Sequence, residues 1–461
     1  MKKTAGTKKI NPNKVPISKL FAWPTRNISA GAVVIIIGYL SLYCTDTLGM
    51  SPALVGSLLM ASKIFDGVTD LIAGYLVDNT KTKWGKGRPY EFCIIGLWVC
   101  TYALFAVPEQ WGVTGKAIWI FIMYTLTFSV FQTLLNASET TYIIRAFGSK
   151  EAVTKVSSIG GIIITLGCMV VSVTFPMMVA SQGGSASGWR SFMMIYTIPL
   201  LALGLIRFFI VKEDKVVEKE DIQSSTGEDK VSVKEIFILL RKNKYLWLCG
   251  IALMIPKMLG AMSAGTYYFQ RVVGNLGAYS ILQIFSVVIL VVMVFFPMLI
   301  RRFSGMYVIG MAAVIGIVGY VLNFFAGKNM ALLILGSVLC GISTLPGSYL
   351  KSPIIMSIAE YNTMHGMKRM EATMASVLNF LEKLGNAFAL FMMGILLSAA
   401  SYDGTAAVQP DSAILMIRLC YSLIPAAMTV IVIFCCIAFN PLDKEVAKKN
   451  LNHEEKENGN I

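Results

Sequence analysis

Charged side chains are scarce in this chain. Only 14% of its 461 residues are Asp, Glu, Lys or Arg, whereas 56% are hydrophobic and the mean hydropathy is +0.67. A soluble protein carries about 25% charged residues, so the composition excludes an ordinary soluble globular protein. It indicates a chain whose main solvent is the lipid bilayer.

Histidine is almost absent, and the cysteines are not spaced like metal ligands. The two histidines, His365 and His453, fall in a predicted cytoplasmic loop and in the tail, which excludes a histidine proton relay inside the membrane. The nine cysteines lie in apolar segments, so we interpret them as small buried residues rather than disulfides or metal ligands. Without a Gly-x4-Gly-Lys-[Ser/Thr] loop or a nucleophile–base pattern, neither an enzyme nor a cofactor is expected.

Apolar stretches recur along nearly the whole chain. A helix needs about 20 residues to cross a hydrocarbon core of about 30 Å. Because β-strand alternation is missing, helices are the expected way to satisfy the backbone in lipid. We therefore predict an all-α membrane protein of 12 transmembrane helices. The predicted spans are 28–45, 53–78, 91–108, 116–146, 154–181, 189–211, 245–272, 278–300, 306–326, 330–360, 371–400 and 412–440.

The net charge of +14 indicates how the chain is oriented in the membrane rather than nucleic-acid binding. Lys and Arg gather in the amino terminus, in the loops after even-numbered spans and in the tail. The loops on the other side carry only Lys116, Arg190, Arg271 and Lys328. The positive-inside rule then predicts that both termini lie in the cytoplasm. The expected location is the bacterial inner membrane, as a multi-pass protein. The first apolar segment lacks a cleavage site, so we expect an uncleaved first helix.

The longest charged interruption, residues 212–244, divides the spans into two sets of six. It is either a solvated cytoplasmic connection or a regulatory segment. The predicted domains are a cytoplasmic amino terminus (1–27), an amino-terminal six-helix bundle (28–211), the linker (212–244), a carboxy-terminal six-helix bundle (245–440) and a cytoplasmic tail (441–461).

Ionisable residues stand within the second span, where Lys63, Asp66, Thr69 and Asp70 fall within eight positions. Residues four apart share one helix face, and each Asp at mid-membrane costs about 2.5–3.5 kcal/mol. Two carboxylates on one face also raise one another's pKa. Lys63 could neutralise one acid and leave the rest as helix–helix contacts. Because one lysine cannot neutralise both, we favour a site for a cation or a proton.

A second motif follows this span, with Gly74, Asp78, Gly85 and Arg88. Gly74 permits close helix approach, and Asp78 at a helix end can pair with basic groups and neighbouring helix termini. A merely basic turn would not explain the Gly-x-x-x-Asp spacing. The pattern resembles the loop motif of the major facilitator superfamily, where it serves conformational change.

The chain as a whole resembles the glycoside–pentoside–hexuronide:cation symporters. The second-span motif carries the resemblance, which continues in order along the chain. Further matching segments are Tyr43-Cys-Thr45-Asp46-Thr-Leu-Gly49, Tyr267-Tyr268-Phe269, Glu360-Tyr361, Arg369-Met370-Glu371, Leu381-Glu382-Lys383-Leu384-Gly385 and Pro410-Asp411-Ser412.

The resemblance implies a coupling-ion site. Asp66 and Asp70 match the family's two cation-binding carboxylates, and Lys63 matches the basic residue beside them. Thr133 matches a hydroxyl ligand in the fourth span. Thr69 replaces Asn of some members, which keeps an oxygen but leaves Na⁺ and H⁺ open. If a metal ion binds, Asp66 and Asp70 would hold Na⁺.

The resemblance also implies a substrate site. Lys383 matches the family's intramembrane lysine, and Asn136 stands where melibiose permease has a sugar-binding carboxylate. Asn136 can donate and accept hydrogen bonds. Glu139, one turn later, either supplies the missing acid or pairs with Arg145.

Three further residues are candidate substrate contacts. Asn379 lies one turn before Lys383, and Lys257 follows a proline that breaks the seventh span. Lys257 and Lys383 together could bind an anionic sugar such as a hexuronide. Tyr267 could stack on a sugar ring or pack against its neighbours.

These features predict a secondary active transporter that carries a sugar or glycoside together with Na⁺ or H⁺. Its two halves would rock around a site near the bilayer midplane. We expect a monomer in the lipid bilayer, with no nucleic acid as partner. The alternatives are a transporter of a non-sugar organic solute and a membrane sensor that no longer transports.

Overall fold

The structure is a computed structural model, and it describes residues 15–80, 82–147, 150–213, 241, 243–285, 303–367 and 370–458. Within these ranges the regular elements are helices. In the first half they are α1 (Ile17–Ile37), α2 (Leu40–Leu42), α3 (Pro52–Asn79), α4 (Cys93–Leu104), α5 (Val113–Thr125), α6 (Thr133–Phe147), α7 (Lys150–Gln182) and α8 (Ala186–Ile210).

The second half continues the helical pattern. Its helices are α11 (Lys244–Ala261), α12 (Ala264–Tyr267), α13 (Tyr279–Phe285), α16 (Gly305–Ala326), α17 (Met330–Met364), α18 (Glu371–Ala399), α19 (Asp411–Tyr421) and α20 (Leu423–Asn458). Each predicted span coincides with one or more helices. The eighth does so only in its first residues, because 286–302 lie outside the described ranges.

Eight helical segments in the described ranges are long and apolar enough to cross a membrane, judged by length and composition. One of them joins α5 and α6 through an intervening helical turn, and another is α16. Their outward faces remain apolar, as at Ile162, Leu166 and Val170 of α7. Apolar side chains on the outer face of a long helix are suited to contact with lipid.

Two of the described helices extend well beyond the predicted spans. α1 begins at Ile17 rather than at residue 28, and α20 runs on to Asn458. Arg26, which the sequence places before the first span, lies inside α1 with 2% of its surface exposed. Arg26 forms ion pairs with Glu91 and Glu139, so its charge is matched inside the protein.

Within the described ranges, three spans contain a π-helical segment, in which each bonded turn holds one residue more than in an α-helix. These are η1 (Tyr43–Thr47), η3 (Leu126–Gln132) and η5 (Tyr268–Val273). The seventh span is also broken between α11 and α12, where Ser263 adopts a left-handed conformation (φ 51°). Non-helical backbone at membrane depth is tolerated where it is buried in protein or lines a cavity.

The described helices fall into two compact units. The first contains the described residues within 1–37, 65–172 and 186–228, and the second contains those within 38–64, 173–185 and 229–461. The first unit has a core around Trp23 and Tyr142, whose ring centroids are 5.2 Å apart. The guanidinium of Arg207 lies 3.6 Å from the centroid of Trp23, so this core carries a buried positive charge.

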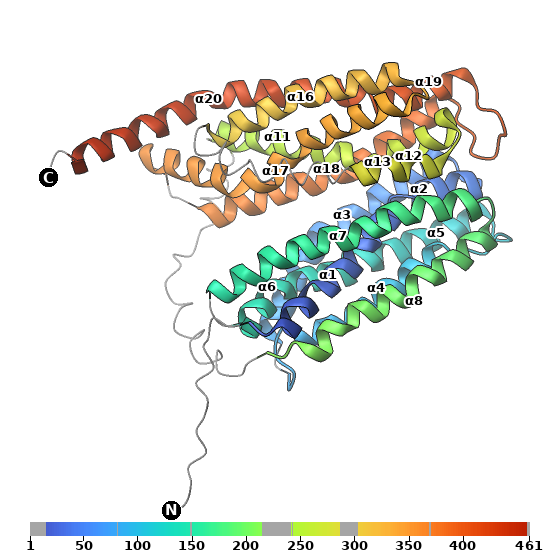
Figure 1. Cartoon of the computed structure of the whole chain (residues 1–461), viewed down its shortest axis with the longest axis horizontal. Helices are drawn as coiled ribbons and strands as arrows, with labels where there is room; N and C mark the ends of the chain where they lie inside the picture. Colours follow the sequence, from blue (N-terminus) through green and yellow to red (C-terminus); the bar gives the residue numbers. More distant parts are fainter. Residues whose placement is uncertain are drawn as a thin grey trace, which may run out of the picture. The chain divides into compact units, whose positions relative to one another are not determined.

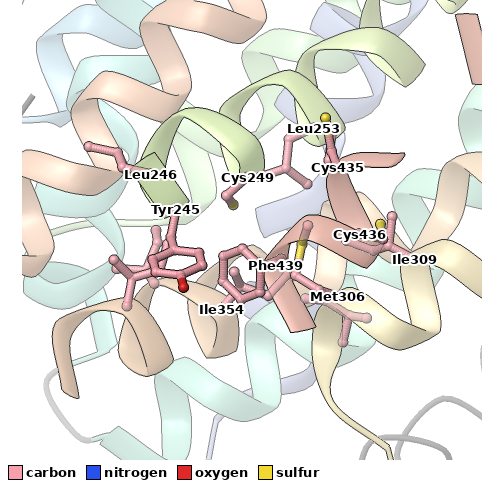
Figure 2. Packing of buried hydrophobic residues seen from close by; sticks show 14 of the residues in the cluster. Tyr245, Leu246, Cys249, Leu253, Met306, Ile309, Ile354, Cys435, Cys436 and Phe439 are labelled. Carbon is pink, nitrogen blue, oxygen red and sulfur yellow. The ribbon is translucent and has the colours of Figure 1, made fainter. Parts of the chain in front are cut away.

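The second unit has an apolar core of its own. α16 packs along α17 and α20, and Figure 1 shows these three helices side by side. Tyr245 and Phe439 meet edge to face within the core, next to Met306 and Ile354 (Figure 2). Between α16 and α17 the helices approach at Gly319, where a Cβ atom would lie 2.6 Å from the carbonyl oxygen of Gly336. Small residues allow such backbone contacts between membrane helices.

Residues 38–64 belong to the second unit through two sets of contacts. Asp46 Oδ2 lies 2.6 Å from Arg271 Nη2, and Asp46 Oδ1 accepts a hydrogen bond of 2.8 Å from the Tyr402 hydroxyl. Further along α3, a Cβ atom on Gly56 would lie 2.7 Å from the carbonyl oxygen of Leu390 in α18. Ionic and backbone contacts together hold this part of the first half against the second unit's helices.

Candidate functional site

The second-span carboxylate Asp66 is buried and hydrogen bonded. Its side chain is 6% exposed, and the hydroxyl of Ser129 donates a short hydrogen bond to Asp66 Oδ1. Ser129 lies in the π-helical segment η3 and is 1% exposed. π-helical turns within α-helices occur often at functional sites. Both residues belong to the first unit.

The other residues predicted to bind the cation lie near Asp66 or Ser129 in the sequence. The Thr69 hydroxyl donates to the carbonyl oxygens of Phe65 (3.1 Å) and Asp66 (3.2 Å) on its own helix. Thr133 is buried, and its hydroxyl donates to the carbonyl oxygen of Phe128 at 3.1 Å. Lys63 is half-buried on α3. Each hydroxyl oxygen keeps lone pairs with which it can also accept a hydrogen bond or bind a cation.

Part of the second-span motif lies outside the described side chains. Asp70, Gly74 and Asp78 are in the backbone of α3, but their side chains or immediate surroundings are not among the described positions. The pairing of Asp70 with Asp66 therefore stays a prediction.

Glu139 lies in a buried network of charges. It forms ion pairs with Arg26 and, at 2.7 Å, with Arg207 Nη2. Glu91 completes the network, with Oε1 3.1 Å from Arg207 Nη2. The side chains of Glu91 and Arg207 are fully buried, and Arg26 is 2% exposed. Two carboxylates facing two guanidinium groups balance their charges, which offsets part of the cost of removing them from water.

Two candidate substrate contacts differ in exposure. Asn136 is exposed on α6, and its Oδ1 accepts a 3.3 Å hydrogen bond from Gln132 Nε2. Tyr267 of α12 is 1% exposed, and its hydroxyl lies 3.3 Å from the Thr45 hydroxyl. In this structure Asn136 is therefore accessible, whereas the Tyr267 ring is packed inside the second unit.

A polar cluster joins α17 and α18 in the second unit. Lys351 Nζ lies 2.6 Å from Glu382 Oε1 and 2.5 Å from Oδ1 of the predicted substrate residue Asn379. Lys383 follows on α18 and is half-buried, and Lys257 is exposed on α11. Sequence reasoning named Asn379, Lys383 and Lys257 but missed Lys351 and Glu382. The signal was present, since a lysine inside the tenth predicted span requires a partner.

The loop after the second span is held by an acid that the sequence pattern did not single out. Glu213, just past the end of α8, accepts hydrogen bonds from the backbone N–H groups of Lys86 (3.0 Å), Gly87 (2.9 Å) and Arg88 (2.6 Å). Successive N–H groups that converge in this way form an anion-binding concavity. Gly85 has a φ of +116°, and a Cβ atom there would lie 2.3 Å from the Glu213 carboxylate. The turn therefore requires glycine.

Arg88 ties the same loop to α8 a second time. Its Nε and Nη2 donate to the carbonyl oxygen of Phe208 at 3.0 and 2.8 Å. Its guanidinium also lies 4.6 Å from the centroid of the Phe208 ring. Of the predicted conformational motif, Arg88 therefore connects the second-span loop to the end of the sixth span, and Gly85 forms the turn beside Glu213.

Comparison with known proteins agrees with this architecture. Residues 29–444 match the family described as MFS/sugar transport protein. The isoprimeverose transporter of Lactiplantibacillus pentosus is 24% identical over 402 residues, which are 85% of this chain and 82% of that protein. The glucuronide carrier protein homolog of Escherichia coli is 23% identical and covers 89% of each chain.

Solved structures share the fold at low identity. A nucleoside transporter has a TM-score of 0.67 and 14% identity, and the match covers 91% of this chain and 99% of that one. A D-xylose–proton symporter has a TM-score of 0.60, also at 14% identity. The family match confirms the resemblance to the glycoside–pentoside–hexuronide:cation symporters. A helical chain with acids inside its spans, matched over nearly its whole length, is therefore a transporter of the MFS/sugar transport protein family, within the major facilitator superfamily, and not an enzyme.

Proposed function

We propose that this chain moves a sugar or glycoside across the bacterial inner membrane together with Na⁺ or H⁺, by alternating access. The observation that carries the proposal is the buried Asp66 carboxylate with the Ser129 hydroxyl at its oxygen. A carboxylate at this depth is costly unless a positive charge shares it. The names of the relatives, an isoprimeverose transporter and a glucuronide carrier homolog, support a sugar as the substrate.

Asp66 and Asp70 would bind the coupling ion, with Thr69, Thr133 and Lys63 around them. Before binding, the Ser129 hydroxyl donates to Asp66. When Na⁺ binds, the hydroxyl can turn so that its oxygen, like the carboxylate, faces the cation. When H⁺ binds instead, the protonated carboxyl becomes a donor and Ser129 accepts. Either ion neutralises a negative charge whose burial is costly when the site is closed to water.

The substrate would contact Asn136 together with Asn379, Lys383, Lys257 and Tyr267. Asn136 and Asn379 supply the paired donors and acceptors that sugar hydroxyls need. The ion pairs of Glu139 with Arg26 and Arg207 favour a structural role for this acid, which then leaves no free carboxylate for the sugar at this position.

A solute with a negative charge is the second candidate. Lys257, Lys351 and Lys383 stand on α11, α17 and α18, and Glu382 balances one of them. The ammonium groups of Lys257 and Lys383 could bind the carboxylate of an anionic sugar such as a hexuronide. A non-sugar organic acid could bind the same two groups.

Transport by purified protein in proteoliposomes tests these proposals. A panel of labelled glycosides and glucuronides is offered under separate Na⁺ and pH gradients. Asp66→Asn should abolish uphill accumulation but retain counterflow, since exchange does not require net movement of the ion. Because linkage is reciprocal, substrate should also tighten cation binding in the wild type. Normal accumulation by Asp66→Asn would refute coupling at this residue.

The sidedness of the termini and the oligomeric state are part of the same proposal. The distribution of Lys and Arg favours cytoplasmic termini, and we propose a monomer as the transporting unit. Labelling of single cysteines in the amino terminus and tail of intact cells with a membrane-impermeant reagent tests the orientation. Modification of either terminus from outside would contradict it.

A further inference from the structure

An aromatic cluster of the first unit joins the loop after the second span to α4 and α8. Between ring centroids, Trp84 lies 5.8 Å from Phe92, which precedes α4, and 5.7 Å from Phe208, near the end of α8. Phe92 and Phe208 are 4.3 Å apart, and Phe209 lies 5.3 Å from Phe208. Phe208 is buried, whereas Trp84 is 51% exposed and Phe209 is 65% exposed. The cluster therefore presents large aromatic rings at the end of an apolar helix.

The exposed rings continue the outward apolar faces of the same two helices. At the start of α4, Phe92, Ile95 and Val99 are exposed, and residues three and four apart lie on one face of a helix. On α8, which packs against α4, Ile195 and Ile198 are exposed. Exposed apolar side chains at this spacing are suited to contact with acyl chains. The aromatic cluster therefore lies where the lipid-facing surface of α4 and α8 ends.

Basic side chains border the aromatic cluster. Lys83 and Lys86 stand on either side of Trp84 in the loop, and Lys212 follows the end of α8. Lys83 and Lys212 are exposed, and none of the three lysines forms an ion pair with another residue in the described part of the chain. The neighbouring acid, Glu213, directs its carboxylate to backbone N–H groups of the loop. The described residues of this surface therefore carry an excess of positive charge.

We propose that this surface binds an anionic phospholipid of the adjacent leaflet. The acyl chains lie along the exposed faces of α4 and α8, and the rings of Trp84 and Phe209 pack at the level of the glycerol. Lys83 and Lys86 pair with the phosphate. Tryptophan is enriched at this level of a membrane, and lysines next to a membrane span attract anionic lipids.

Two properties of the surface select this partner. A soluble phosphate compound would pair with the lysines but leave the apolar faces of α4 and α8 without an occupant. A zwitterionic lipid would cover those faces but would bring its own positive charge close to Lys83 and Lys86, which weakens the attraction. An anionic phospholipid meets both requirements. The lipid site depends on neither the transported substrate nor the coupling ion.

The exposed Trp84 is the reporter for the test. Full-length protein is placed in phosphatidylcholine nanodiscs, and phosphatidylglycerol or phosphatidylcholine with brominated acyl chains, which quench tryptophan fluorescence, is titrated in. The signal of Trp84 is the difference between wild type and Trp84→Phe. We expect phosphatidylglycerol to associate at least about fivefold more strongly than phosphatidylcholine. Trp111, read in the same way through Trp111→Phe, is the control. It is 41% exposed at the other end of α4, close to the acid Glu109, and should show no preference.

Variants of the basic residues locate the effect. The double variant Lys83→Gln, Lys86→Gln should lower the preference for phosphatidylglycerol at least about fivefold, whereas Lys116→Gln in α5 should leave it unchanged. Soluble glycerol phosphate should not displace the lipid, since it lacks acyl chains. The proposal is overturned if Trp84 shows no preference for phosphatidylglycerol, if the double variant keeps that preference, if glycerol phosphate abolishes it, or if Trp111 shows it to the same extent.

Discussion

The guanidinium of Arg271 forms an ion pair with the carboxylate of Asp46, with 2.6 Å between Arg271 Nη2 and Asp46 Oδ2. Arg271 also donates to the carbonyl oxygen of Gly404 at 2.7 Å, and the Tyr402 hydroxyl donates to the other oxygen of Asp46. Burial, together with the negative charge of Asp46, raises the pKa of the Tyr402 hydroxyl, so it remains a donor at neutral pH. The pair thus joins η1, η5 and the loop before α19.

Asp46→Asn should destabilise the second unit because it leaves Arg271 without its counter-charge. We expect the free energy of unfolding to fall by about 1–3 kcal/mol, measured by thermal unfolding in detergent. Asp403→Asn is the matched control, since Asp403 lies in the same loop and its carboxylate accepts a hydrogen bond from the exposed Thr405 hydroxyl. Equal losses in the two variants would show that the ion pair adds no more stability than the hydrogen bonds of the exposed Asp403.

Ser129→Ala should weaken the binding of the coupling ion. The variant removes the hydroxyl that faces Asp66, and loss of a group that orients a ligand costs about 10–100-fold in ion affinity. The measurement is the Na⁺ or H⁺ concentration that half-activates uptake. Ser138→Ala serves as control, because the buried Ser138 hydroxyl donates to the carbonyl of Leu135. The same activation curve for both variants would remove Ser129 from the site.

Glu213→Gln should loosen the loop after the second span. A neutral amide accepts the three backbone hydrogen bonds more weakly than a carboxylate, so opening should become easier by about 1–2 kcal/mol. Trypsin should then cleave faster at Lys83 and Lys86. Glu109→Gln removes an exposed acid 3.8 Å from Arg190 and should leave cleavage unchanged. Unaltered cleavage in Glu213→Gln would contradict the anchoring role.

Lys351 and Glu382 should be energetically coupled. Lys351→Met, Glu382→Gln and the double variant form a cycle, and each single change leaves a charge in a half-buried position. We expect a coupling energy of about 0.5–3 kcal/mol from thermal unfolding. The exposed pair Arg190–Glu109 is the matched comparison, for which about 0–1 kcal/mol is expected. A value near zero for Lys351–Glu382 would mean that the two charges act independently.

The helices could be predicted from the sequence, because a membrane span needs about 20 apolar residues. Within lipid, a helix satisfies all of its backbone hydrogen bonds internally. The start of α1 was not predicted, because a charged residue, Arg26, lies inside the helix. In the sequence, Arg26 resembles a solvent-exposed residue. Its ion-pair partners, Glu91 and Glu139, belong to other predicted spans. Pairing between distant spans leaves no local pattern, so neither the network nor the true start of the helix could be read from α1 alone.

The candidate site was predictable in its acids and less so in its other polar groups. Asp66 stands out because a carboxylate is rare in an apolar span, whereas a serine such as Ser129 is ordinary there. Glu213 follows the last apolar residues of the sixth span and resembles any acid at the start of a linker. Its role depends on a loop more than 120 residues earlier in the chain, as its contacts with Gly87 and Arg88 show.

The π-helical segments η1, η3 and η5 have a consequence for comparison with relatives. Each residue of an α-helix turns the chain by about 100°, and a π turn holds one residue more between its bonded groups. After η1, η3 or η5, each residue therefore lies on the helix face that the preceding residue would occupy in an uninterrupted α-helix. Relatives that lack these turns should align only with a one-residue gap inside 43–47, 126–132 or 268–273.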